Sequence, residues 1–257
     1  RGRGQHAPGR LTLSLTFHPK PRSNPAMLVR TAVLLLGLVH PAQEPDSTVL
    51  IQRTAVGARN IARDFALPEW ALQLIESDRK YAKSDQDKAE LAMAECNVLL
   101  ARADLSRDME ERLNLYAAAG AAYGRVVEQF ASTTVAQQAQ RQVGLTAFQY
   151  ANSLDQFFSA NEVTDGQRVT LIAAAEPFFK SAIKAMNDLI RWFEKLPSDH
   201  EDREVLLSEI YFPTQFFRAI TYTAWARLHG PGTLERDQYS KQAIEYLEDF
   251  ALSAGGP

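Results

Sequence analysis

The stretch YAAAGAAYGRVVEQF, residues 116–130, has alanine or glycine at seven of its first nine positions. Glycine inside a helix costs about 1 kcal/mol relative to alanine, so a helix that faces only water gains nothing from it. We therefore expect a second helix to cross this one closely at Gly120 and Gly124. Membrane helices use the same small-residue spacing. Here, however, Arg112 and Arg125 bracket a stretch that is too short and too weakly apolar to span a bilayer.

The tyrosine that opens this stretch begins a pattern that recurs along the chain. After Tyr116 come a small residue at offset four and apolar residues at offsets seven and eleven. Two further copies begin at aromatic residues 62 and then 61 residues later, and a weaker copy without the aromatic begins 62 residues earlier. Such recurrence is typical of stacked helical units. The copies are Tyr116, Gly120, Tyr123 and Val127; Phe178, Ala182, Ala185 and Leu189; Tyr239, Ala243, Tyr246 and Phe250; and, weaker, Thr54, Ala58, Ile61 and Phe65.

Helical periodicity extends over the rest of the chain from residue 46. Apolar residues recur at steps of three and four, and no stretch alternates apolar and polar residues as a strand would. Ser84 and Asp87 form a capping box that predicts a helix start, and Pro213 within an apolar helix predicts a kink. The sequence predicts an all-α fold over residues 46–252, built of stacked antiparallel helical hairpins with long helices and a repeat near 61 residues.

The residues around Gly120 resemble the tetratricopeptide repeat family. In that family a small residue, an aromatic residue four later and a small or aliphatic residue three after that pack helix against helix. A second pattern resembles exported and periplasmic members such as the barrel-assembly lipoproteins. A regular repeat of the family has about 34 residues, so the helices here are longer or the connections irregular. The resemblance implies a TPR-like α-solenoid that binds a protein or peptide in its groove. The matching residues are Ala119, Tyr123 and Val126 for the first pattern and Phe130, Ala136, Ala139, Val143 and Gly144 for the second.

The first 42 residues differ in kind, with six basic residues and no acidic one. From Met27 an arginine, an apolar run and a Pro-Ala exit follow in the order of a secretory signal peptide. We predict a signal peptide at residues 27–42, a disordered upstream extension at residues 1–26, and an exported protein that is periplasmic or associated with the cell envelope. A disordered basic arm is the alternative. No further membrane span is expected.

The charge of the remaining chain argues against nucleic acid as a partner. The whole sequence holds 28 basic and 31 acidic residues, so the part after residue 42 has a net charge of −9. A nucleic-acid-binding protein shows the opposite balance.

No residue pattern points to catalysis. Cys96, the single cysteine, lies on an apolar helix face, where a buried and inert thiol is expected. The acidic residues around His200 suit a helix N-terminus better than a metal site. Phosphate-loop, dinucleotide, zinc-protease and nucleophile-elbow motifs are absent from the sequence. We predict no enzyme activity, no cofactor and no metal.

Two aromatic clusters are the candidate partner-binding residues. Tyr211, Phe212 and Phe216 either belong to a buried helix or line a groove in which a peptide docks. Phe157 and Phe158 end a helix before a polar loop, where they either cap the core or form exposed anchors. Both alternatives stay open for each cluster.

These features together predict a non-catalytic protein–protein interaction scaffold. The competing class is an enzyme or small-ligand-binding protein with a pocket between helices, and a homodimer through the Gly120 face is a third option. The last predicted helix, residues 239–250, has an apolar face with no following partner. Terminal repeats usually have a polar outer face, so the array is expected either to continue beyond this sequence or to be covered by another protein.

Overall fold

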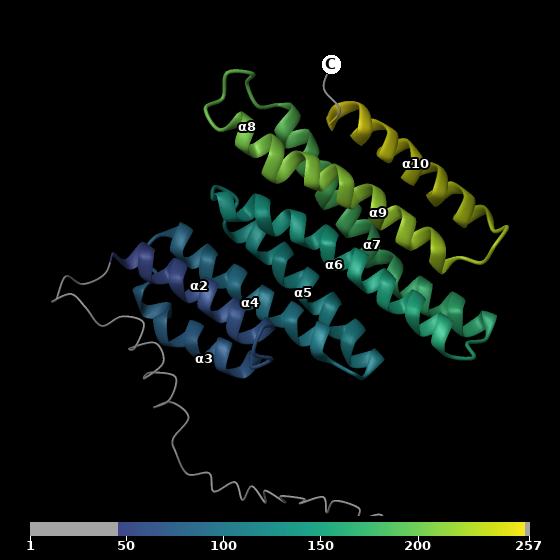
Figure 1. Cartoon of the computed structure of the whole chain (residues 1–257), viewed down its shortest axis with the longest axis horizontal. Coiled ribbons are helices and arrows are strands. Elements are labelled where there is room, and N and C mark those ends of the chain that lie inside the picture. Colours follow the sequence, from purple (N-terminus) through teal and green to yellow (C-terminus); the bar gives the residue numbers. More distant parts are fainter. Residues whose placement is uncertain (1–45, 255–257) are drawn as a thin grey trace, which may run out of the picture. The chain divides into compact units, whose positions relative to one another are not determined.

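The computed structural model describes residues 46–254, and every regular element among them is a helix (Figure 1). The predicted all-α class is therefore confirmed. The predicted upstream extension, residues 1–26, and the predicted signal peptide, residues 27–42, lie outside the described residues. The elements are α2 (Ser47–Arg63), α3 (Pro68–Asp78), the short η1 (Arg79–Tyr81), α4 (Asp85–Leu105), α5 (Met109–Gln129), α6 (Thr134–Ala160), α7 (Asp165–Glu194), α8 (Arg203–Leu206), the π-helical η2 (Leu207–Tyr211), α9 (Phe212–Leu228) and α10 (Leu234–Ala254).

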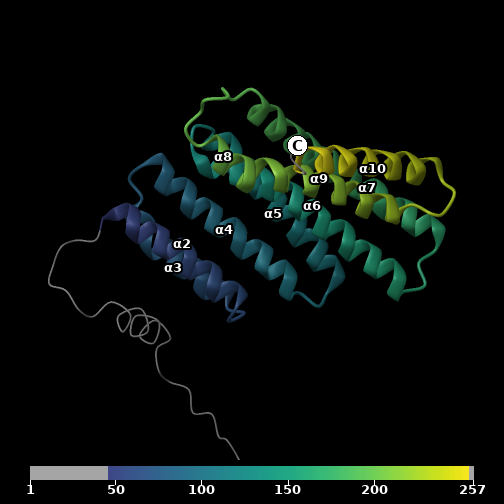
Figure 2. The same ribbon diagram turned by 45° about the horizontal axis from the view of Figure 1, so that its top comes forward.

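Three kinds of helix contact organise the described residues. Within four successive pairs, α2 packs against α3, α4 against α5, α6 against α7, and α9 against α10. The second helix of a pair also packs on the first helix of the next, most extensively α5 on α6. The first helices of the pairs also contact one another in the order α2, α4, α6 and α9, which makes a continuous row (Figures 1 and 2). Arg141, early in α6, bonds the carbonyl of Glu209 just before α9, and Arg227, late in α9, bonds Asn152, late in α6. Helices α6 and α9 therefore run in the same direction.

The hydrophobic core consists of three clusters that follow one another along this row. The first, with Ile51 and Ile75, joins α2, α3 and α4. The second surrounds Tyr123, which is fully buried between α4, α5 and α6. The third contains Phe179 and Trp225 and joins α5, α6, α7, α9 and α10. Because each pair buries its apolar face against the next, no single pair forms a core of its own.

Gly120 marks the close helix crossing that the sequence predicts. A Cβ atom at Gly120 would collide with the ring of Phe178 on α7, coming within 2.6 Å of its Cζ atom. Gly144 on α6 is equally confined, since a Cβ there would lie 2.7 Å from Met186 Cγ. The expectation for Gly124 is wrong, because a Cβ atom there would meet nothing within 4 Å. One turn separates the two glycines of α5, and only the first faces α7 at contact distance.

The three stronger copies of the recurring pattern lie on equivalent helices. The copies that begin at Tyr116, Phe178 and Tyr239 fall on α5, α7 and α10, each the second helix of its pair. The weaker copy at Thr54 falls on α2, which is the first helix of its pair. The second helix of that pair, α3, has only 11 residues, too few for the full pattern of offsets.

The irregularity expected at Pro213 is located just before it. Pro213 is the second residue of α9, where a missing backbone N–H leaves few hydrogen bonds unmade. The preceding segment, η2, has π-helical hydrogen bonding, which widens one turn of an otherwise helical run. A second proline, Pro177, lies inside helix α7, and its position was not predicted from the sequence.

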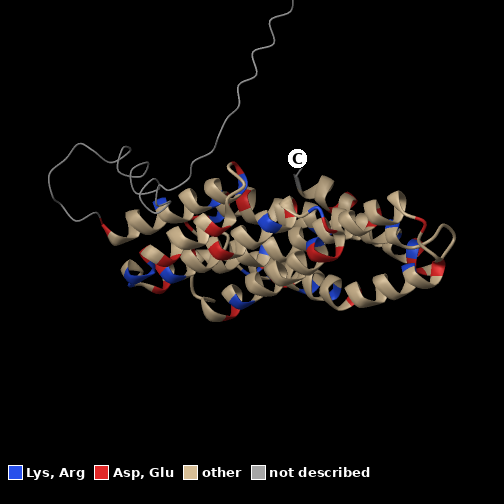
Figure 3. Cartoon of the chain, turned by 90° about the horizontal axis from the view of Figure 1, so that it is seen from below, with Lys and Arg blue, Asp and Glu red and all other residues tan. Residues whose placement is uncertain are grey.

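Charged residues are interspersed along the helices in the view of Figure 3. Exposed pairs such as Lys184 and Asp188, at 2.6 Å, link neighbouring helical turns. The outer side of α10 is different, because Ile244 and Leu247 are exposed there. The apolar face predicted for this helix is instead partnered, because Tyr239, Ala243 and Tyr246 pack in the third core cluster and Phe250 lies against Phe212 and Phe216 of α9. None of the helices between residues 46 and 254 has both the length and the apolar character that a membrane crossing requires.

The predicted capping box at the start of α4 is confirmed and gives a test of local stability. Ser84 Oγ accepts from the Asp87 N–H at 3.0 Å, and Asp87 Oδ2 accepts from the Ser84 N–H at 3.2 Å. Ser84→Ala should therefore lower the free energy of unfolding by about 1 kcal/mol, measured by urea denaturation. Ser132→Ala, at an exposed position outside any cap, is the control and should change it by less than about 0.5 kcal/mol. Equal effects of the two variants would contradict the assigned role of the cap.

Candidate binding groove

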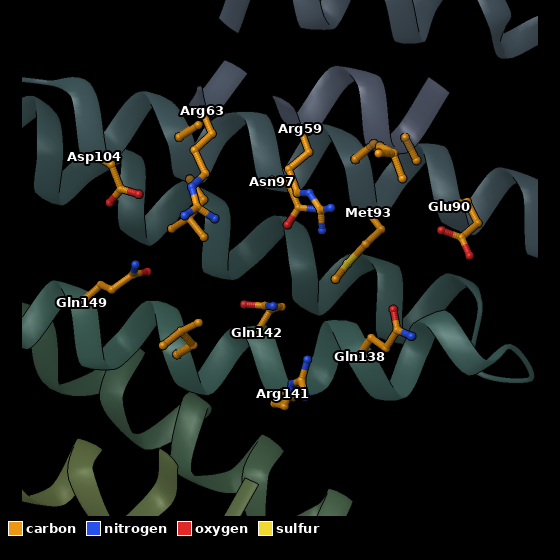
Figure 4. Close-up of a pocket in the computed structure, with 16 residues that line it drawn as sticks. Arg59, Arg63, Glu90, Met93, Asn97, Asp104, Gln138, Arg141, Gln142 and Gln149 are labelled. Carbon is orange, nitrogen blue, oxygen red and sulfur yellow. The ribbon is translucent and has the colours of Figure 1, made fainter. Parts of the chain in front are cut away.

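A groove of about 610 Å³ lies between α2, α4 and α6, the first three helices of the row (Figure 4). This volume is within the range of ligand sites in proteins. None of the five aromatic residues predicted from the sequence lines it. Its lining residues are Ala55, Val56, Arg59 and Arg63 of α2; Glu90, Met93, Ala94, Asn97, Leu100, Ala101 and Asp104 of α4; and Gln138, Arg141, Gln142, Leu145 and Gln149 of α6.

Helix α2 contributes two arginines, one helical turn apart. Arg59 and Arg63 are both exposed, and residues four apart share one face of a helix. Figure 4 shows their side chains extending from α2 toward α4. On the same side of the groove, α4 presents Asn97 and Asp104. This side therefore carries two cations, an amide and a carboxylate, and it faces α6.

Two tyrosines of α5 hold the polar residues of α4 in place. The Tyr116 hydroxyl donates to Asp104 Oδ1 at 2.7 Å, and the Tyr123 hydroxyl donates to Asn97 Oδ1 at 2.8 Å. Burial, and then the bond to Asp104, raise the pKa of Tyr116 to about 12, and burial raises the pKa of Tyr123 further. Both hydroxyls stay protonated at neutral pH. Since Asn97 Oδ1 accepts from Tyr123, the amide N–H groups of Asn97 are left to face the groove.

Helix α6 contributes a row of glutamines. Gln138, Gln142 and Gln149 are spaced four and seven residues apart, which places them on one face of the helix. Figure 4 shows the three side chains along the α6 side of the groove. The Oε1 atoms of Gln142 and Gln149 are buried and have no hydrogen-bond partner among the described residues. Buried polar atoms are nearly always paired, so these two acceptors mark positions where a donor is missing.

Two further charged residues of the groove, Arg141 and Glu90, form hydrogen bonds within the protein. The Arg141 guanidinium donates to the carbonyl of Glu209 in η2 at 2.5 Å, and burial lowers its pKa. Glu90 accepts from Gln86 Nε2 at 3.2 Å, and burial raises the pKa of its carboxyl group. Part of the hydrogen-bonding capacity of these two residues is therefore used within the protein.

The predicted residues Tyr211, Phe212 and Phe216 form a separate aromatic cluster. Tyr211 lies with its ring 4.5 Å from that of Phe193 on α7. The rings of Phe212 and Phe216 lie 6.3 and 5.7 Å from that of Phe250 on α10. Phe216 is exposed, and the other two are partly buried. The cluster joins α7, α9 and α10, and its partner-binding role stays a prediction.

The predicted residues Phe157 and Phe158 lie near the end of α6, whereas Tyr211 and Phe212 lie at the start of the parallel helix α9. The structure thus does not bring the two aromatic clusters together. Phe158 is buried in the core, where the Arg168 guanidinium lies 4.6 Å from its ring. Phe157 is partly buried and packs against the same core cluster. The core alternative therefore describes Phe158 best.

The predicted burial of Cys96 is confirmed. Its side chain belongs to the second core cluster and is 3% exposed. Burial raises the pKa of the thiol to about 12, so it stays protonated at neutral pH. A protonated and inaccessible thiol is a poor nucleophile.

The groove residues were missed by sequence reasoning because they are ordinary polar residues on exposed helix faces. One signal was present: glutamines at positions 138, 142 and 149 form a polar stripe beside the apolar stripe of α6. The stripe alone does not show that α2 and α4 lie across from it.

Comparison with protein-family models, with curated proteins and with solved structures gave no match.

Proposed function

We propose that this chain is a non-catalytic interaction scaffold, a TPR-like α-solenoid that binds an extended segment of a partner protein in the groove of α2, α4 and α6. The arrangement of contacts supports the solenoid. Each pair packs mainly on its neighbours, and the first helices form one row, as expected for stacked repeats. The resemblance at Ala119, Tyr123 and Val126 points to the same class.

The unpaired glutamine oxygens are the observation on which the proposal rests. An extended peptide offers one N–H and one C=O per residue, and the Oε1 atoms of Gln142 and Gln149 require donors. The seven-position step from Gln142 to Gln149 spans about 10 Å along α6, the length of about three residues of extended chain. Both oxygens have almost no accessible surface, so a peptide lying along α6 would bond them after the two side chains turn toward the groove, and the amide of Asn97 would supply a donor from the facing wall.

The charges of the groove favour a peptide with an acidic side chain. Arg59 and Arg63 approach the groove from one side and are exposed. A carboxylate of the ligand could bond either guanidinium, and such charge-assisted bonds are stronger than neutral ones. At the exposed edge of the groove, these contacts would weaken as salt is added.

Export remains part of the proposal. The segment from Met27 to Ala42 has the order of a signal peptide, and a scaffold of this class would then act in the periplasm or cell envelope. Expression of the chain with and without residues 27–42, followed by cell fractionation, tests this step. Equal distribution of the two forms would contradict export.

A peptide-binding experiment tests the groove. Peptides are selected from a random display library on the full chain, and their affinities are measured by fluorescence anisotropy. Two lost hydrogen bonds should make the double variant Gln142→Ala, Gln149→Ala bind about tenfold more weakly. Gln156→Ala, a glutamine on the same helix outside the groove lining and exposed, is the matched control and should bind normally.

The aromatic cluster provides the competing result. If the double variant Phe212→Ala, Phe216→Ala loses binding while it stays folded, and the glutamine variant does not, the binding surface is at α9 and α10. The groove assignment would then be wrong, although the scaffold class would stand. If the selection yields no peptide that binds the chain, the interaction role itself loses its support.

A further inference from the structure

A second pocket, of about 480 Å³, lies between α7, α9 and α10, away from the groove of α2, α4 and α6. Two of its polar lining residues, Gln215 and Arg218, come from α9. Helix α7 contributes Glu194, and α10 contributes Tyr246 and Asp249. The pocket is thus lined by acidic and basic groups from three helices and has the size of a small-molecule site.

Arg218 is a buried cation whose charge is incompletely matched. The residue is 9% exposed, and its Nη1 atom donates to Asn187 Oδ1 at 2.9 Å. The guanidinium carbon lies 3.7 Å from the centre of the Tyr246 ring. Its Nε atom is buried without a hydrogen-bond partner, and no carboxylate among residues 46–254 forms an ion pair with it. A buried charge is unfavourable unless it is paired, and Asp249 offsets this one electrostatically without bonding it, so what the Nε–H group lacks is a direct acceptor.

Gln215 places an unpaired acceptor beside this donor. It is 4% exposed, and its Oε1 atom has no hydrogen-bond partner among the described residues. Residues three apart on a helix are neighbours on one face, and both residues line the pocket, with the Gln215 oxygen and the Arg218 Nε–H group buried beneath its surface so that a ligand reaches them when these side chains turn. A ligand that satisfies both must present an acceptor and a donor close together.

The acidic residues of the pocket decide the charge of that ligand. Glu194 and Asp249 both line it, and the Tyr211 hydroxyl donates to Glu194 at 3.5 Å. A simple anion would be drawn to Arg218 but repelled by the two carboxylates, and a simple cation would be repelled by Arg218. A zwitterion avoids both penalties. Its carboxylate would bond Arg218, and its ammonium group would bond Gln215 and one of the acids.

We infer that the pocket between α7, α9 and α10 binds a small zwitterion with a carboxylate and an ammonium group, the chemistry of a free α-amino acid. This site is distinct from the proposed peptide groove, and neither requires the other. The ligand forms no covalent bond in this account. Its carboxylate accepts a hydrogen bond from the Arg218 Nε–H group, and its ammonium group donates one to Gln215 Oε1.

Isothermal titration of the full chain with each standard L-amino acid tests the inference. At least one should bind. Its carboxamide and its N-acetyl derivative should each bind at least about thirtyfold more weakly, because each lacks one of the two charges. If no free amino acid binds, or if the carboxamide binds as tightly as the acid, the inference is overturned. This comparison needs no variant and is therefore independent of folding.

Variants of the two arginines of α9 locate the site. Arg218→Gln and Arg218→Lys both remove the Nε–H group, and Arg218→Lys retains the positive charge. Each should weaken binding at least about tenfold, with folding checked by circular dichroism. Arg227→Gln is the matched control, because Arg227 is exposed on the same helix and pairs with Asp155 of α6 at 3.6 Å. An equal loss in the Arg227 variant, or no loss in a folded Arg218 variant, would place the ligand elsewhere and overturn the assignment.

Discussion

Trp225→Ala should lower the free energy of unfolding by about 3–5 kcal/mol, the range found when a buried tryptophan or phenylalanine is truncated. Trp225 is 2% exposed, and its ring stacks on Phe179 of α7 with 4.3 Å between ring centres and an angle of 6°. The same cluster holds residues of α6, α7, α9 and α10. The loss should therefore loosen the docking of the last two pairs, as measured by urea denaturation.

Trp225→Phe is the matched control for this prediction. The indole Nε1 atom of Trp225 is buried without a hydrogen-bond partner among the described residues. Replacement by phenylalanine retains a ring against Phe179 and removes that unpaired donor, so it should be less damaging than Trp225→Ala by at least about 1 kcal/mol. Equal losses in the two variants would show that stacking on Phe179 contributes nothing.

Gly120→Leu should lower the free energy of unfolding by about 1–3 kcal/mol, because side chains added to a filled site force their neighbours apart. A Cβ atom at this position already collides with the Phe178 ring, and Phe178 in turn lies 5.6 Å, centre to centre, from the Tyr150 ring of α6. The double variant Gly120→Leu, Phe178→Ala should recover part of the loss, because it provides space for the new side chain.

Gly124→Leu supplies the comparison within the same helix. A Cβ atom at Gly124 meets nothing within 4 Å, and leucine favours a helix more than glycine does by about 0.8 kcal/mol. This variant should therefore be neutral or slightly stabilised, as measured by the same denaturation. If both glycine variants were destabilised equally, the contact with Phe178 would not explain the glycine at position 120.

The local features of the fold were predictable because they depend on residues close in sequence. Helical periodicity, the capping box of Ser84 and Asp87, and the glycine of the α5 crossing are all visible within short windows. The partner of Gly120 was not, since Phe178 lies 58 residues away. Gly124 shows the same limit: it resembles Gly120 in sequence, and only the position of α7 distinguishes the two.

The candidate groove was not predictable for a related reason. Its polar residues come from three helices, α2, α4 and α6, that are not consecutive. Sequence reasoning favoured aromatic residues, which are conspicuous and common at interfaces, and so selected Tyr211, Phe212 and Phe216. Gln142 and Gln149 become conspicuous only when the structure shows their oxygens buried and unpaired.

Site-specific photo-cross-linking tests the central proposal most directly. Benzoylphenylalanine is introduced separately in place of Gln138, Gln156 or Phe216, each protein is irradiated with a peptide selected on the full chain, and the products are identified by mass spectrometry. Gln138 lines the groove and is exposed, so the groove proposal predicts a cross-link from position 138 and none from position 156 or 216. A cross-link from position 216 alone would contradict it and would place the peptide on the aromatic cluster of α9 and α10.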